Sequence, residues 1–288
     1  MTFSIVGYDP EEQAWGVAVA SKFLAVGAMV PWARAGAGAV ATQSYANTSY
    51  GPRGLEMMAS GLSADETLAR LLENDPEREK RQVGLIDSRG EAAAFTGKAC
   101  HPWAGDLTGK YFAIQGNILV GPQVVEAMTN AFLETEGNLP ARLYAALLAG
   151  DRAGGDRRGR QAAAIYVVKP HGGYGGFTDR WVDYRVDDHP DPVTRLGELL
   201  KLHDLYFGKS APQERLRLEG DVLRRLQDIM RKAGHYHGES TGEMDAVTRK
   251  ALDAFIGSEN FEERYDPEEG WIDRPVFDFL ASRFLTRP

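Results

Sequence analysis

The order of strand-like and helix-like segments is the feature that most restricts the fold of this 288-residue chain. Strands come first, followed by helices, strands, helices and again strands, as far as residue 187. A doubly wound parallel sheet requires single strands to alternate with single helices, so this order disfavours it. No G-x-G-x-x-G follows a strand, and no Walker-type phosphate loop is present. The order instead predicts two stacked sheets covered on both faces by helices.

The first two strands form a predicted hairpin. Residues 2–8 and 15–21 are rich in strand-forming residues, and Asp-Pro-Glu-Glu at 9–12 is a turn sequence. Antiparallel pairing across this turn places Thr2 opposite Ala20 or Ser21, with Lys22 just beyond. We therefore expect Thr2 and Lys22 to be neighbours at one end of a sheet.

Thr2 is itself a candidate nucleophile. A small second residue is typical of chains that lose the initiator Met1, and we expect Thr2 to become the N-terminus. Its hydroxyl then attacks, while its α-amine, with a reference pKa near 8, accepts the proton. The alternative is that Thr2 merely begins a strand. Ser4 is a second hydroxyl on the same strand face, but it lacks an amine of its own.

Composition excludes several classes of partner. The formal net charge is -8, and neither residues 1–212 nor residues 213–288 have an excess of basic residues, so we expect no nucleic acid and no anionic membrane as partner. Cys100 is the only cysteine, which excludes an internal disulfide and fits a reducing compartment. Residues 1–22 lack a secretory signal pattern, and the apolar stretch 23–42 is interrupted by Pro31 and Arg34. These features predict a cytoplasmic protein.

The C-terminal part is predicted to be a separate module. We place the first domain at residues 1–207, a linker at 208–212 and a small helical domain at 213–288. One amphipathic helix is predicted over 214–233, a second starts at Asp245 and buries Val247, Ala251 and Phe255, and a third starts at Asp273. Three short helices around one small core are expected.

Residues 1–207 resemble a family of unknown function in the N-terminal-nucleophile (Ntn) hydrolase superfamily, whose fold is proteasome-like. The motifs that carry the resemblance are Thr2-Phe-Ser-Ile-Val, Gly16-Val-Ala-Val-Ala-Ser-Lys22, Val30-Pro-Trp-Ala-Arg34, Ala41-Thr-Gln43, Ser49-Tyr-Gly-Pro-Arg-Gly54, Gln115-Gly-Asn117, Gly154-Gly-Asp-Arg-Arg-Gly-Arg-Gln161, Gly172-Gly-Tyr-Gly-Gly176 and Val186-Asp-Asp-His-Pro-Asp-Pro192. The resemblance implies an α+β fold of four layers, αββα, with two antiparallel sheets. It also implies hydrolysis of an amide bond through an ester formed on Thr2.

Three further residues have catalytic roles under this resemblance. Lys22 is the candidate cation beside Thr2, favouring the neutral amine, or else a solvated residue that ends a strand. Asn117 and neighbouring backbone N–H groups resemble an oxyanion site, or form an ordinary polar turn. Asp156 sits where related enzymes place an acid that orients the amine, although the arginines within 157–160 offer it surface ion pairs instead.

Substrate contacts are predicted from two groups of residues. Gln43, Ser44 and Asn47 follow a compact strand and are candidates for contacting the substrate. Arg34 and Arg53 are candidates for holding a substrate carboxylate, although arginine is also common on surfaces, and we favour that simpler interpretation. The run Asp187, Asp188, His189 and Asp191 resembles a metal site in composition, but its interleaved prolines favour a helix-capping turn. We expect no metal and no cofactor.

The C-terminal module resembles a peptidoglycan-binding domain. The motifs are Leu226-Gln-Asp-Ile-Met, Gly234-His-Tyr-His-Gly238, Gly242-Glu-Met-Asp245 and Thr248-Arg-Lys-Ala-Leu252. The resemblance implies binding of wall peptide or glycan, and recovered wall fragments, an amide-rich substrate or a protein partner are the ligands we consider. Two functions stay open: an amidohydrolase acting on a small amide or peptide fragment, and a binding protein that has the fold without the chemistry. A homo-oligomer also stays open.

Overall fold

The computed structural model describes residues 2–285. The chain divides into two compact units, Met1–Leu199 and Leu200–Pro288. The predicted boundary after residue 207 coincides with the last residue of α5 (Pro192–Phe207), and the domain boundaries stay a prediction.

The first unit contains a six-stranded sheet in which every pair is antiparallel. Its strands, in sheet order, are β10 (Arg180–Val186), β9 (Ala162–Val168), β2 (Ala14–Ser21), β1 (Thr2–Asp9), β8 (Phe112–Asn117) and β7 (Ala104–Gly109). The central pair is the predicted hairpin. Phe3 lies opposite Ala20, which brings Thr2 level with Ser21 and confirms the predicted register to within its stated range.

A second, four-stranded antiparallel sheet stacks on the first. Its strands, in sheet order, are β3 (Pro31–Arg34), β4 (Gly38–Gln43), β5 (Gln82–Asp87) and β6 (Ala92–Thr96). Buried side chains of both sheets meet between them, among them Val6 and Trp15 from the first sheet and Ile86 from the second. Every neighbouring pair in this second sheet is antiparallel.

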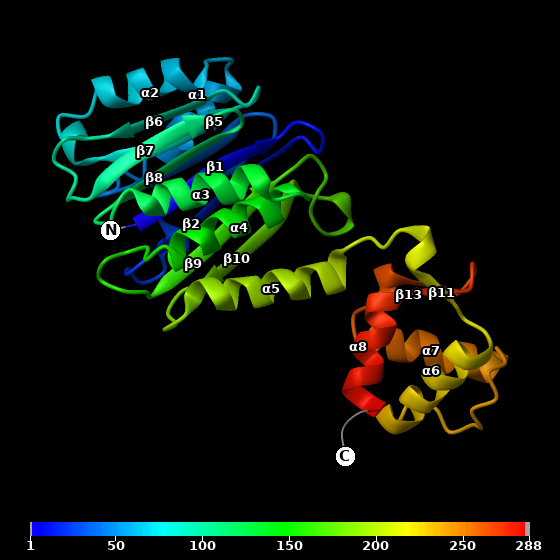
Figure 1. Cartoon of the computed structure of the whole chain (residues 1–288). Coiled ribbons are helices and arrows are strands. Elements are labelled where there is room, and N and C mark those ends of the chain that lie inside the picture. The colour runs from blue at the N-terminus through cyan, green and yellow to red at the C-terminus, as the bar shows by residue number, and fades with distance from the viewer. Residues whose placement is uncertain (1, 286–288) are drawn as a thin grey trace. The chain divides into compact units, whose positions relative to one another are not determined.

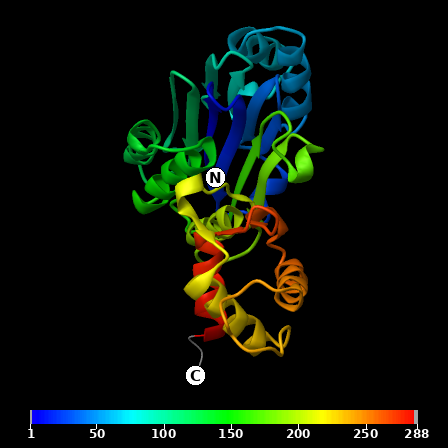
Figure 2. The same cartoon turned by 90° about the vertical axis from the view of Figure 1, so that its right-hand side faces the viewer.

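Helices cover the outer faces. α1 (Tyr50–Ala59) and α2 (Ala64–Glu73) pack on the four-stranded sheet, and α3 (Gln123–Glu134) and α4 (Leu139–Arg152) pack on the six-stranded sheet. Figure 1 and, from the side, Figure 2 show the strands of this unit between the two helix pairs. The predicted α+β fold with two antiparallel sheets is confirmed, and its layers follow the order helix, sheet, sheet, helix.

Helix α2 starts as its sequence predicts. The Ser63 hydroxyl accepts from the Glu66 N–H at 3.2 Å, and the Glu66 carboxylate accepts from the Ser63 N–H at 2.9 Å. This capping box satisfies backbone donors that a helix start leaves unpaired. Strands β3 and β7 were not predicted, because Pro31–Arg34 and Ala104–Gly109 lack the clear alternation of buried and exposed apolar residues.

In its described part, the second unit contains the end of α5, three further α-helices and a small sheet. The helices are α6 (Gly220–Ala233), α7 (Ala246–Ser258) and α8 (Arg274–Leu285), and the sheet order is β11 (Arg215–Arg217), β13 (Trp271–Asp273), β12 (Tyr265–Asp266). The three predicted helices are confirmed, but residues 215–217 form a strand where a helix was predicted from 214. The prediction that Val247 is buried is also wrong, since its side chain is 64% exposed.

Short 3-10 helices complete the described chain, and they are η1 (Val26–Ala28), η2 (Arg78–Lys80), η3 (Tyr174–Gly176), η4 (Pro212–Glu214) and η5 (Glu262–Arg264).

Candidate active site

Thr2 lies at the start of the central strand β1, between β2 and β8. Its partner on β8 is Asn117, and its side chain is 5% exposed. The Thr2 Oγ1 atom lies 3.1 Å from the Ser21 Oγ atom, so the two hydroxyls share a hydrogen bond. Met1, whose removal the sequence predicts, lies outside the described residues.

Side-chain amides from both sheets surround this end of β1. The Gln43 Nε2 group donates to the Thr2 carbonyl at 3.2 Å and to the Gln82 Oε1 atom at 2.9 Å. The same Gln82 oxygen accepts from the Asn117 amide at 2.8 Å. Gln43, Gln82 and Asn117 are each at most 1% exposed. Because both sheets contribute, the position of Thr2 is tied to the stacking of one sheet on the other.

Ser4 and Gln115 extend this network. The Ser4 hydroxyl donates to Gln43 Oε1 at 2.7 Å and accepts from the Gln115 amide at 2.6 Å. The Gln115 Oε1 atom is buried without a hydrogen-bond partner among residues 2–285. It packs against Gly84 so closely that a Cβ atom at that position would overlap it. An unpaired buried oxygen costs free energy, so the network is not optimised for stability alone.

The backbone is strained where the strands next to Thr2 end. Ser44 and Tyr45, directly after Gln43, have φ angles of 55° and 50°. Ile118, directly after Asn117, has a φ angle of 51°. A β-branched residue in the left-handed region is uncommon, and such conformations cluster at functional sites. The strain therefore coincides with the end of the sandwich that carries Thr2.

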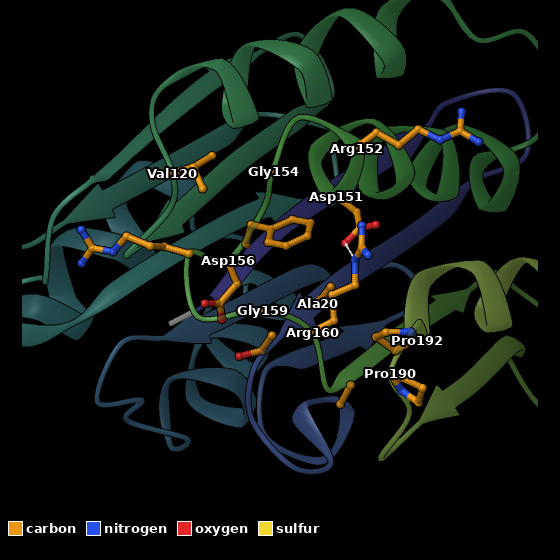
Figure 3. A pocket seen from close by; sticks show the side chains of 14 residues that line it. Ala20, Val120, Asp151, Arg152, Gly154, Asp156, Gly159, Arg160, Pro190 and Pro192 are labelled. Carbon is orange, nitrogen blue, oxygen red and sulfur yellow. Dashed lines mark hydrogen bonds and ion pairs between the residues drawn. The ribbon is translucent and has the colours of Figure 1, made fainter.

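A cavity of about 460 Å³ opens beside this end. Thr2 is not among the residues that line it. Ser21, whose hydroxyl contacts Thr2, and Asp156 both line the cavity, and so does Phe3, the residue after Thr2. Figure 3 shows Asp156 and Gly159 on one side of the cavity and Pro190 and Pro192 on the other. The remaining lining residues are Ala20, Val120, Asp151, Arg152, Gly154, Arg157, Arg160 and Ala162. The cavity is large enough for a small ligand.

Asp156 ties its loop to the end of the hairpin. Its Oδ2 atom accepts from the Lys22 backbone N–H at 2.8 Å, and its Oδ1 atom accepts from the Arg158 N–H at 2.9 Å. The Arg158 guanidinium forms an ion pair with the same carboxylate at 3.1 Å. Arg160 pairs instead with Asp151 at 2.7 Å, as the dashed line in Figure 3 marks. Asp156 thus lies near Thr2 and also has the arginine pairing that the simpler interpretation predicts.

The Lys22 side chain is exposed and reaches the loop that contains Arg160. Its Nζ atom lies 3.5 Å from the Arg160 carbonyl. Antiparallel pairing brings the Lys22 backbone next to Thr2, while the direction of its long side chain depends on that loop. Its role as the cation beside Thr2 stays a prediction.

The predicted substrate residues occupy different places. Gln43 belongs to the amide network, and Ser44 follows it in the strained segment. The Asn47 amide donates to Asp75 at 3.2 Å and its oxygen accepts from the Ser49 N–H, so Asn47 organises the start of α1. Gln43 is the last residue of β4, and Ser44 and Asn47 follow it.

Arg34 and Arg53 lie elsewhere. Arg34 pairs with Gly38, at the opposite end of β4 from Gln43, and is exposed. Arg53 is exposed on α1, which covers the outer face of the four-stranded sheet. The structure does not bring these two arginines to Thr2.

Ser21, Gln82 and Gln115 are site residues that the sequence did not reveal. Each stands at or near the end of a strand, where a polar residue ordinarily marks the transition to a solvated loop. Their burial results from the stacking of two sheets, which no local pattern encodes. The one available signal was the register that places Ser21 opposite Thr2.

Among residues 2–285, no group of three or more His, Cys, Asp or Glu residues is arranged to hold a metal ion. No helix in the same range is long and apolar enough to cross a membrane.

Comparisons with known proteins place the two units in families. Residues 2–196 match the model of a family of unknown function, DUF1028, and residues 206–280 match a model described as "Putative peptidoglycan binding domain". The crystal structure of protein SPO2555 from Silicibacter pomeroyi, which carries the same DUF1028 model, is 32% identical, covers 70% of this chain and 89% of its own, and has a TM-score of 0.65. A search of curated proteins gave no match. The chain therefore belongs to the DUF1028 family of unknown function and carries a peptidoglycan-binding-type domain after it.

Proposed function

We propose that this protein is an Ntn-type amidohydrolase in which Thr2 is the nucleophile. The observation that carries the proposal is the Thr2 hydroxyl, held at the start of β1 among amides of both sheets and 3.1 Å from the hydroxyl of Ser21, which lines the cavity of about 460 Å³. The order of layers, helix, sheet, sheet, helix, supports membership of the Ntn superfamily.

The chemistry needs Met1 removed. The Thr2 Oγ1 atom then attacks the substrate carbonyl carbon, and its proton passes to the free α-amine, directly or through a water. The tetrahedral intermediate collapses as the C–N bond breaks, and the departing amine takes that proton. Water hydrolyses the resulting ester, which releases the carboxylate product and restores the Thr2 hydroxyl.

Three neighbours have supporting roles in this proposal. The Asn117 side-chain amide stabilises the developing oxyanion: one of its two N–H donors binds Gln82, and the other serves the oxyanion. The backbone N–H groups of residues 118–120 already donate to carbonyls. Asp156 holds the end of β2 through the Lys22 N–H, and Lys22 provides positive charge at the rim.

The cavity limits the substrate to a small amide or a short peptide fragment. Its volume is near the lower end of the range for ligand pockets, about 300–1,000 Å³. Asp151 and Arg160 pair within its lining, so the site offers both signs of charge to a polar substrate.

The decisive experiment uses a β-lactone, whose ring opens on a nucleophilic hydroxyl to form an ester. The intact mass is expected to show loss of Met1, and peptide mapping is expected to place the adduct on Thr2. Thr2→Ala should lower the rate of adduct formation by about 10³-fold or more. Thr48→Ala removes an exposed threonine hydroxyl and should leave the rate unchanged.

Two results would reject this proposal. One is retention of Met1 in protein that still forms the adduct. The other is an undiminished rate in Thr2→Ala, with Ser4→Ala tested in parallel because its hydroxyl lies in the same network.

The match of residues 206–280 to a peptidoglycan-binding domain favours a second candidate function, the binding of wall-derived fragments. We further propose a cytoplasmic location, in which the ligand is a recovered fragment and not the intact wall. If the protein only binds fragments and does not hydrolyse them, the full-length Thr2→Ala protein binds them as the wild type does, and neither protein shows hydrolysis.

A further inference from the structure

The small sheet of the C-terminal unit has one face turned to the core and one lined by charged and aromatic side chains. Leu216 and Ile272 pair across β11 and β13 and pack in the core of this unit. Side chains alternate along a strand, so Arg215, Arg217 and Trp271 share the opposite face. The position of β11 and β13 is visible in Figure 1.

A cavity of about 450 Å³ lies on this face. Its lining residues are Pro212, Arg215, Arg217, Glu269 and Trp271. All of them belong to the C-terminal unit, so the cavity is formed within that unit alone.

Arg217 provides an unneutralised positive charge. Its Nη1 group donates to the Glu269 backbone carbonyl at 2.7 Å, and this contact fixes the guanidinium at the cavity. No carboxylate in the described residues forms an ion pair with Arg217. Its remaining N–H donors can therefore bind a carboxylate in the two-pronged geometry that guanidinium favours.

Arg215 is held beside it in an incompletely satisfied state. Its guanidinium carbon lies 3.8 Å from the Trp271 ring centre, a cation–π contact. Its Nε atom is buried, has no hydrogen-bond partner in the described chain and stands 3.8 Å from the Asp273 carboxylate. Arg264 already binds that carboxylate at 2.6 Å. Asp273 therefore neutralises Arg215 only partly.

Glu269 and the two apolar surfaces complete the cavity. The Glu269 carboxylate accepts from the Trp271 indole N–H at 3.1 Å, which leaves its second oxygen to accept from an N–H of a ligand. The rings of Trp271 and Pro212 offer apolar contact. One wall is thus a carboxylate receptor, and another is an acceptor for an amide or ammonium group.

We propose that this cavity binds the carboxylate-bearing end of a short peptide, with Arg215 and Arg217 on the carboxylate, Glu269 on a peptide N–H, and Trp271 and Pro212 on the aliphatic part. The inference rests on the fragment-binding role proposed for this unit and names its ligand chemistry. Peptidoglycan stem peptides have these groups, whereas neutral amino-sugar chains lack the carboxylate.

The test is titration calorimetry on the full-length protein carrying Thr2→Ala, which keeps the probes intact. The probes are a synthetic wall stem tetrapeptide, the same peptide with its carboxylates amidated, and a β-1,4-linked N-acetylglucosamine tetramer. We expect the tetrapeptide to bind, the amidated peptide to bind at least tenfold more weakly, and the sugar tetramer not to bind.

Variants then assign the site. Arg217→Ala should weaken tetrapeptide binding about tenfold or more, and Arg217→Lys should recover only part of the loss because it keeps the charge without the fork. Arg231→Ala, which removes an exposed arginine of the same unit outside the cavity, should leave binding unchanged. Circular dichroism confirms that each variant is folded.

The inference fails if the tetrapeptide does not bind, if the amidated peptide or the sugar tetramer binds as well as the tetrapeptide, or if Arg217→Ala and Arg231→Ala behave alike. None of these results bears on the proposed role of Thr2, which is tested by adduct formation and not by binding affinity.

Discussion

Near Trp15 the space between the two sheets of the first unit is filled by apolar side chains, whereas near Thr2 the same space is filled by amides and hydroxyls. Val17 and Val19, on the strand that links the two ends, belong to the apolar cluster. Two residues further along β2 is Ser21, which bonds to Thr2. One hairpin therefore supplies both environments.

The difference teaches what each end contributes. Apolar burial stabilises the sandwich in proportion to the area removed from water, and it dominates the packing at the Trp15 end. Buried amides need a partner for every donor and acceptor, and Gln115 Oε1 lacks one in the described chain. Burying the polar end therefore costs free energy of folding, and such departures from the simplest packing are expected at functional sites.

The largest effect on stability is expected at the apolar end. Trp15 is 1% exposed, and its indole N–H donates to the Asp87 carbonyl at 2.9 Å. Trp15→Ala should lower the free energy of unfolding by about 3–5 kcal/mol, measured by urea denaturation. The folded fraction should still form the β-lactone adduct on Thr2 at the wild-type rate. Two results would contradict a separation of stability and reactivity between the two ends. One is a loss of unfolding free energy of less than about 1 kcal/mol, and the other is a lower rate of adduct formation per folded molecule.

A smaller loss of stability with a larger loss of reactivity is expected at the polar end. Gln82→Ala removes the oxygen that accepts from both Gln43 and Asn117. The unpaired donors should lower the free energy of unfolding by about 2 kcal/mol. Because Gln43 also binds the Thr2 carbonyl, the adduct rate of folded protein should fall several-fold. If folded Gln82→Ala protein formed the adduct as fast as folded Trp15→Ala protein, the polar end would have no special role in the reactivity of Thr2.

The sequence allowed the apolar end to be predicted more fully than the polar one. Alternation and the turn at residues 9–12 predicted the hairpin, and its register places Thr2 level with Ser21. The direction of the Lys22 side chain was not predictable, because it depends on the Arg160 loop, which is distant in the sequence. The contacts of Gln43 with Gln82 and Gln115 were not predictable either, because these residues come from three strands of two sheets.

The C-terminal unit shows the same limit at smaller scale. Asp245 is predicted as a helix cap, and it accepts from the Thr248 N–H at 2.7 Å. The strand β11 is mistaken for the start of a helix because a three-residue strand carries no periodicity of its own. Residues 215–217 form a strand because they pair with β13, which comes more than fifty residues later in the sequence.

The smallest effect on stability is expected at Asp75, a buried carboxylate near the polar end. Asp75 is 6% exposed and binds Arg81, Asn47 and Tyr50, which fixes the segment after Gln43. The Arg81 guanidinium holds the pKa of the Asp75 carboxyl well below its usual range. A depressed pKa contributes stability that is complete above the unfolded-state value near 3.9 and is lost as the pH falls below it towards the folded-state value.

Asp75→Asn should therefore lower the free energy of unfolding by about 1.5 kcal/mol at pH 7, and by progressively less below about pH 4, where the wild type loses the same contribution. Urea denaturation at pH 7, 4 and 3 measures the narrowing gap. Asp65→Asn provides the matched control, because Asp65 is exposed in the first turn of α2 and its replacement should cost only a few tenths of a kcal/mol. A gap that stays constant with pH would mean that Asp75 stabilises the segment through its shape and not through its charge, and that the polar end of the sandwich has no electrostatic support.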